Sequence, residues 1–196
     1  SAYKGNNLAN VAAYNWNKTG QNTWSTSLLN KTNLNKNFIA NIGADWAAKI
    51  DMTTWKVGGN TFDNKANRPA KTAYQNEIVS PVTTNTTDNA TTYSAKVGLM
   101  YASDYGFAAA PSAWTTNLGF YNGEAIKNVN WMYMGLVEWT MSRNANNASG
   151  VAYVAGDLGG SSALDAYGVR PVFYLTSSVN YASGSGSATD PILVTD

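Results

Sequence analysis

The chain contains no cysteine and no histidine, and these two absences remove several classes of function. Without cysteine there is no disulfide framework and no thiol nucleophile. Without histidine the chain lacks the commonest zinc ligand and the commonest general base, so Ser-His-Asp and Cys-His catalytic arrangements are excluded. The acidic residues are too few and too scattered for an EF-hand-like calcium loop. We therefore expect no metal site and no cofactor.

Charge is also scarce, since charged residues make up 13% of the chain and the formal net charge is +1. No run of like charges provides the basic stripe of a nucleic-acid-binding protein or a polybasic membrane patch. No stretch approaches the roughly 20 apolar residues of a membrane span. Ser1 opens directly into polar sequence without a signal peptide, and we interpret it as a mature or trimmed N-terminus. Asn, Thr, Ser and Gly must therefore form the surface, as is common on extracellular proteins that meet sugars or other proteins.

The length of 196 residues suits a single domain, residues 1–196. Residues 1–20 form an atypical N-terminal segment, and residues 180–196 are a Gly- and Ser-rich tail with a last short strand. Between them, apolar spacing predicts an early helix that begins near Trp24, capped by Ser25 or Thr26. A second helical segment covers residues 38–50, where Gly43 either weakens one helix or divides it into two short pieces.

The middle of the chain alternates strand and helix signals. Residues 52–57 predict a strand, residues 72–79 a helical turn, and residues 83–92 an exposed Thr- and Asn-rich loop. Residues 96–101 predict a buried strand, and Ser103 is the expected N-cap of a helix over residues 104–110.

The stretch 131–175 organises the C-terminal half of the chain. β-Branched and aromatic residues bounded by turn residues predict strands at 135–143, 151–154 and 167–175, joined by polar loops. The predicted fold class is α+β, with early helices, long loops and a twisted, mostly antiparallel sheet. Because aromatic side chains dominate burial in a domain of this size, we assign Trp46, Trp55, Trp131 and Trp139 to the core.

Three segments also carry a family resemblance: GLMYASDYG at 98–106, WTMS at 139–142 and YGVRPVFYL at 167–175. In this order they resemble the C-type-lectin-like and formylglycine-generating-enzyme superfamily, and most closely a branch of Gram-positive surface and pilin-like proteins. The resemblance covers the chain from Trp24 onward and implies a C-type-lectin-like domain. It also implies that the loops before the last strand form the recognition surface. Relatives carry an earlier pair of strands that this chain lacks, so either residues 1–20 replace them or the chain starts inside the usual domain and a sheet edge is left open.

The resemblance does not extend to the chemistry of the family's best-known member. That oxidase depends on copper-binding cysteines, which this chain lacks. The motifs by which calcium-dependent lectins hold sugar are absent as well. Glu138, Asp157 and Asp165 lie in one region, but nothing in their spacing places two carboxylates as a glycosidase requires. We therefore expect a protein that is not an enzyme.

A ligand site would have to use neutral amides, hydroxyls and aromatic faces in the loops 143–150 and 156–165. The candidates are Arg143, Asn144, Asn146, Asn147, Asp157 and Asp165, with Trp114 and Tyr121 as stacking platforms. The alternative is that the loop 144–150 is a solvated hairpin without a specific function. Glu138 and Arg170 are interpreted as a structural pair, in which Arg170 donates to loop carbonyls or to Glu138. Trp139 is the third structural residue.

These features predict an extracellular bacterial surface domain that binds a glycan or protein ligand in adhesion, as a free or pilus-associated module. The alternative is a structural subunit of an extracellular filament, sheath or virion appendage, which would bind copies of itself by strand or surface complementation.

Overall fold

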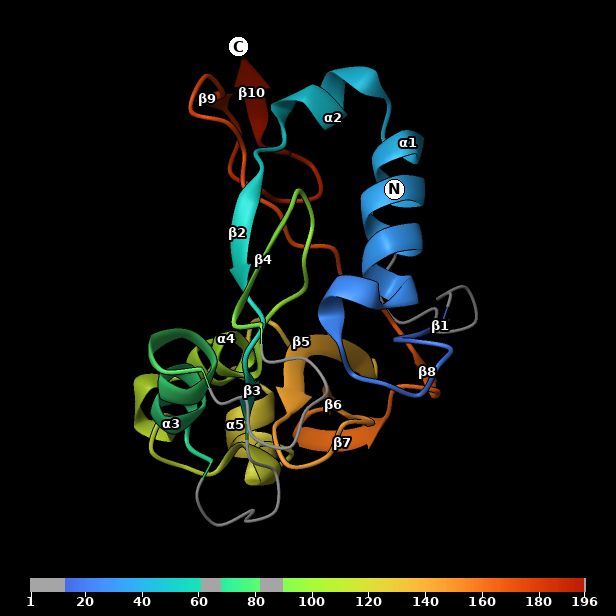
Figure 1. Ribbon diagram of the computed structural model, residues 1–196. Coiled ribbons are helices and arrows are strands. Elements are labelled where there is room, and N and C mark those ends of the chain that lie inside the picture. Colours follow the sequence, from blue (N-terminus) through green and yellow to red (C-terminus); the bar gives the residue numbers. More distant parts are fainter. Residues whose placement is uncertain (1–12, 61–67, 82–89, 196) are drawn as a thin grey trace.

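The computed structural model describes residues 13–60, 68–81 and 90–195, and it has the α+β composition that the sequence predicts (Figure 1). The predicted loop 83–92 lies largely outside these residues, as does most of the N-terminal segment 1–20. No helix of the described ranges combines the length and the hydropathy that crossing a membrane requires.

A four-stranded sheet occupies the lower half of the molecule in Figure 1. Its order is β3-β5-β6-β7, with β3 parallel to β5 and the other neighbours antiparallel. The strands are β3 (Gly59–Asn60), β5 (Glu138–Asn144), β6 (Gly150–Val154) and β7 (Leu158–Ser162).

Three further strand pairs are all antiparallel. They join β1 (Tyr14–Asn15) to β8 (Ala166–Tyr167), β2 (Thr53–Lys56) to β4 (Thr92–Ala95), and β9 (Asn180–Ser183) to β10 (Leu193–Thr195). The β1–β8 pair attaches the N-terminal segment to the beginning of the stretch 167–175.

The helices form two groups. The early group is η2 (Trp24–Thr26), the π-type helix η3 (Leu29–Phe38), α1 (Ile39–Asn41) and α2 (Ala44–Lys49). The later group is α3 (Ala70–Tyr74), η5 (Gln75–Val79), α4 (Ala102–Phe107), η6 (Pro111–Ala113), η7 (Leu118–Phe120) and α5 (Glu124–Lys127). In Figure 1, η3 and α1 run away from the sheet beside β2 and β4, and α2 lies with β9 and β10 at the far end. Gly43 has φ 87° and separates α1 from α2, so the predicted division into two short pieces is confirmed.

The core is built on both faces of the sheet. Because neighbouring residues of a strand point to opposite faces, Ala152 and Val151 of β6 belong to different clusters. Ala152 packs with α3, α4 and the segment around Leu118, whereas Val151 packs with Trp139 and the early helices. Gly106 allows α3 and α4 to approach closely, since a Cβ there would lie 2.6 Å from the Cβ of Ala70.

Two core assignments are confirmed and two are wrong. Trp139 and Trp55 are buried, but Trp131 is 78% exposed and Trp46 is 46% exposed. Trp131 follows α5 in a turn, where its backbone N–H donates to the Ala108 carbonyl oxygen while its ring remains at the surface. Trp46 lies on α2, a short helix in which no residue is buried.

Three local predictions also need correction. The N-cap of α4 is Tyr101 rather than Ser103, and Asp104 accepts a hydrogen bond from the Tyr101 backbone N–H at 2.8 Å. Residues 97–100 are buried as predicted, but a single bridge from Gly98 to Val172 replaces the expected ladder. The predicted strand 167–175 is likewise reduced to β8 and isolated bridges.

One polar side chain couples the early helix to this extended segment. Asn35 of η3 donates to the Val97 carbonyl oxygen and accepts from the Val97 N–H, both at 2.9 Å. Val97 is fully buried, so its backbone groups have no water to replace this partner.

We expect Asn35→Ala to lower the free energy of unfolding by about 2 kcal/mol in urea denaturation. Asn37→Ala, at an exposed position of the same helix, is the matched control and should change it by less than about 0.5 kcal/mol.

Candidate functional site

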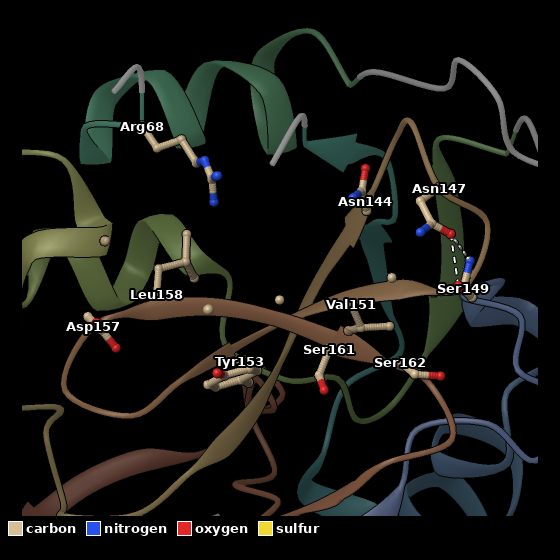
Figure 2. Close-up of a pocket in the computed structure, with 14 residues that line it drawn as sticks. Arg68, Asn144, Asn147, Ser149, Val151, Tyr153, Asp157, Leu158, Ser161 and Ser162 are labelled. Carbon is tan, nitrogen blue, oxygen red and sulfur yellow. Dashed lines mark hydrogen bonds between the residues drawn. The ribbon is translucent and has the colours of Figure 1, made fainter. Parts of the chain in front are cut away.

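A polar hollow of about 640 Å³ lies along β7, between the loop that joins β5 to β6 and the segment that precedes α3 (Figure 2). We call it the β7 hollow. Its lining is dominated by amides, hydroxyls and glycine backbone. The lining residues are Arg68, Gly119, Asn144, Asn147, Ser149, Gly150, Val151, Tyr153, Asp157, Leu158, Gly159, Gly160, Ser161 and Ser162.

The loop 144–150 forms one end of the β7 hollow. Its conformation is stabilised internally, because the Oδ1 atom of Asn144 accepts from the Asn146 N–H at 2.8 Å. Asn147 Oδ1 accepts from both the N–H and the hydroxyl of Ser149, at 2.9 and 2.8 Å. These are the local side-chain to backbone turns that Asn favours. Figure 2 shows the two asparagine carboxamides at this end of the hollow.

Arg68 forms the opposite wall, and Figure 2 shows its guanidinium directed toward Leu158 at the start of β7. Arg68 is 5% exposed, so its side chain is part of the wall rather than a free surface group. Among the described residues of the lining, Asp157 is the one acidic residue and Arg68 the one basic residue. The described part of the lining is therefore close to neutral.

The floor of the hollow depends on the two glycines of β7. A Cβ at Gly159 would lie 2.3 Å from the ring of Tyr153, so this ring covers the Gly159 backbone. A Cβ at Gly160 would meet nothing within 4 Å, which leaves the Gly160 backbone open. Tyr153 also contacts Tyr167, with ring centroids 5.0 Å apart. Burial, with smaller effects of Tyr167 and Asp157, raises the pKa of Tyr153, so its hydroxyl remains a neutral donor and acceptor.

The outer edge of β7 is partly covered. Ala163 N–H donates to the Ser149 carbonyl oxygen, so alternate residues of β7 bond to β6 and the backbone groups of Ser162 point outward. Asp165 covers both of those groups: its carboxylate accepts from the Ser162 N–H at 3.2 Å, and its own N–H donates to the Ser162 carbonyl oxygen at 2.9 Å. Its carboxylate also accepts from the Ser161 hydroxyl. A charged residue in this position is a typical protection of an edge strand.

The structure brings only part of the predicted ligand set together. Asn144, Asn147 and Asp157 line the β7 hollow, whereas Asn146, Asp165 and Trp114 do not. Trp114 is 36% exposed and packs edge-on against Phe107, with ring centroids 5.2 Å apart.

For two residues of the predicted ligand set, Arg143 and Tyr121, the prediction is wrong because their side chains are buried. Arg143 is 1% exposed, since it lies within β5 and faces the interior, and its Nη2 donates to the Ala90 carbonyl oxygen at 3.3 Å. Tyr121 is fully buried, and its hydroxyl donates to the carbonyl oxygens of Gly106 and Ala113 at 3.2 and 2.9 Å. Neither side chain can stack on or contact an external ligand.

The predicted pair of Glu138 and Arg170 is present. Arg170 Nε donates to Glu138 Oε1 at 3.1 Å, and Arg170 Nη2 donates to Glu138 Oε2. The same Nη2 donates to the Met132 carbonyl oxygen at 2.9 Å. Both predicted partners, the acid and a loop carbonyl, are therefore used, and together they join β5 to the segment that follows β8.

Sequence reasoning missed β7 itself and the hydroxyls on it. The segment 156–165 was expected to be a loop, because Gly159-Gly160 is a turn signal. In the structure, residues 158–162 pair with β6 over their whole length. No sequence pattern indicated Arg68 as a site residue either, because it lies in a polar stretch immediately before Pro69.

No cluster of three or more acidic residues within the described ranges could hold a metal ion. Comparison of the chain with protein-family models, with curated proteins and with solved structures finds no match. The resemblance to the lectin-like superfamily therefore stays a prediction, and the geometry of the site must carry the functional argument.

Proposed function

We propose that this chain is an extracellular surface domain that binds a neutral glycan in the β7 hollow. The observation that carries the proposal is the lining: side-chain amides, serine hydroxyls and open glycine backbone, with one basic and one acidic residue. Hydroxyl and amide groups both donate and accept, which matches the hydroxyl groups of a sugar. A hydrophobic small molecule would instead favour a mainly apolar pocket with few polar groups.

Filament assembly by strand addition, the alternative function, has weaker support at this sheet. The Asp165 contacts occupy the outward backbone groups of Ser162. At the other end of β7, a Cβ at Gly119 of η7 would lie 4.0 Å from the Leu158 carbonyl oxygen. Along β7, within the residues that the structure describes, this leaves the centre of the strand, near Gly160, for a partner. Light scattering on the native protein separates the alternatives, because a subunit of a filament forms large assemblies and an isolated binding domain has a mass near 21.0 kDa.

The binding test is a glycan array followed by titration of the best neutral hit against two glycine variants. Gly160→Leu places a side chain in the open part of the hollow, where nothing obstructs its Cβ. We expect the dissociation constant to rise at least about tenfold, which corresponds to about 1.4 kcal/mol.

The matched control is Gly123→Leu, an exposed glycine outside the hollow with similarly open surroundings. It should leave the affinity within about twofold. An array on which the wild-type protein binds no glycan, or equal affinity of both leucine variants and wild type, would contradict the proposal.

A further inference from the structure

The loop 144–150 is attached to the N-terminal segment by one buried side chain. Asn22 is 1% exposed, and its Nδ2 atom lies 3.0, 2.9 and 2.7 Å from the carbonyl oxygens of Asn144, Asn147 and Gly150. Its backbone N–H also donates to the Ala148 carbonyl oxygen at 2.6 Å. A single residue therefore contacts the main chain at the beginning, the middle and the end of the loop.

Asn22 is itself held in place independently of this loop. Trp16 is fully buried and donates from its indole N–H to the Thr140 carbonyl oxygen at 3.3 Å. Asn17 donates from its backbone N–H to the Ala163 carbonyl oxygen at 2.9 Å, and its Nδ2 donates to the Gln21 carbonyl oxygen at 3.0 Å. The segment around Asn22 thus packs on β5 and on the residue after β7. It forms a hydrogen-bonded support against which the loop can be ordered.

The loop needs such a support because its own sequence is poor in side chains that pack. Residues 144–150 read Asn-Ala-Asn-Asn-Ala-Ser-Gly, and within them only Ala145 is buried. A loop of this composition has many accessible conformations, and ordering it on binding would reduce the affinity for a ligand. Fixing the carbonyl groups beforehand removes that cost, since Asn144 and Asn147 then present their side chains to the hollow in one arrangement.

We propose that Asn22 is a positioning residue of the glycan site, which presets the loop 144–150 so that the β7 hollow exists before the ligand arrives. That the ligand is a glycan rests on the proposed function. The anchoring of the loop itself can be measured without any ligand.

The experiment compares Asn22→Asp with Asn35→Asp in the full chain. Each variant replaces an amide donor that contacts backbone carbonyls by a carboxylate of the same size, but Asn35 contacts Val97, away from the hollow. Asn22→Ser is a milder third variant in case the aspartate at position 22 prevents folding. Two quantities are measured: hydrogen exchange of the Asn146, Ser149 and Gly150 amides, and binding of triacetylchitotriose and maltotriose, two neutral trisaccharides, by NMR titration.

We expect Asn22→Asp to accelerate exchange of the three loop amides at least tenfold and to weaken trisaccharide binding at least tenfold, with Asn22→Ser intermediate. Asn35→Asp should lower stability but leave both readouts at their wild-type values. Unchanged loop exchange in the Asn22 variants would overturn the proposal, as would a loosened loop with wild-type affinity. If wild type binds neither these sugars nor any array glycan while the Asn22 variants still loosen the loop, the proposed function fails and the anchoring role stands.

Discussion

Replacing Arg170 by methionine is expected to lower the free energy of unfolding by about 3–5 kcal/mol, because it leaves the Glu138 carboxylate buried without its partner. Glu138 is 4% exposed, and its two oxygens are paired with two nitrogens of the same guanidinium. The fork geometry matters as much as the charge, since only a guanidinium reaches both carboxylate oxygens and the Met132 carbonyl oxygen at once. Arg170→Lys should therefore recover less than half of the loss. Urea denaturation followed by tryptophan fluorescence measures all of these differences.

The double variant Glu138→Gln with Arg170→Met is the control for this interpretation. It removes the buried charge together with its partner, so it should be more stable than Arg170→Met alone by at least about 1.5 kcal/mol. Lys127→Met provides a second control, because Lys127 is a partly exposed cation whose ammonium lies 5.8 Å from the Tyr133 ring centre. It should cost less than about 1 kcal/mol. A loss below 1 kcal/mol for Arg170→Met would show that the pair contributes little and that Glu138 finds water or another donor.

The features that could be predicted from the sequence are those that depend on residues close together in the chain. Hydrophobic and β-branched runs located β5 and β6, Gly43 marked the break between α1 and α2, and Trp139 lay in a strand that was recognisably buried. Trp131 shows the limit of this reasoning, since an aromatic residue is a burial signal only when the backbone turns it inward. In the turn after α5 the backbone places its ring at the surface.

The candidate site was predicted less well because it depends on contacts between distant residues. Asn22 and Gly150 are 128 residues apart in the chain, and Asn35 and Val97 are 62 apart, so no local sequence pattern predicts either contact. Asparagine is also abundant in this chain, so an anchoring asparagine looks like a solvated one. β7 was missed for the opposite reason, because its local pattern was misleading: Gly159-Gly160 resembles a turn until pairing with β6 and the Tyr153 ring explain why side chains are absent there.

A second buried carboxyl, Glu77, is expected to make the stability of the protein depend on pH in the direction opposite to most acids. Glu77 is 1% exposed and lies where η5, the beginning of α4 and β5 meet. Burial raises the pKa of Glu77 to about 7, although hydrogen bonds from Ser103 and Ser142 act against this shift. The Ser103 N–H donates to Oε2 at 3.1 Å, the Ser142 hydroxyl donates to Oε1, and the same hydroxyl accepts from the Ala102 N–H at 3.0 Å.

The sign follows from which state binds the proton more tightly. The pKa of Glu77 in the folded state, about 7, lies above the ordinary value of 4.5, so the folded protein holds the proton over that interval and the unfolded chain releases it. Stability should therefore fall as the pH rises from about 4.5 to about 7, by an amount on the order of 3 kcal/mol, and then level off. Glu77→Gln cannot ionise. The free energy of unfolding of this variant, relative to that of wild type, should rise by about 3 kcal/mol between about pH 4 and about pH 8. The variant should therefore be the more stable protein at about pH 8.

Measuring the free energy of unfolding of both proteins across that range isolates the contribution of this carboxyl, because every other titrating group is common to the two. Glu124→Gln, at an exposed position of α5, is the matched control and should follow the wild-type curve. A constant difference between Glu77→Gln and wild type over the whole range would mean that Glu77 titrates at its ordinary value. In that case the contacts with Ser103 and Ser142 would offset the effect of burial, and the junction of η5, α4 and β5 would hold a charged carboxylate at neutral pH.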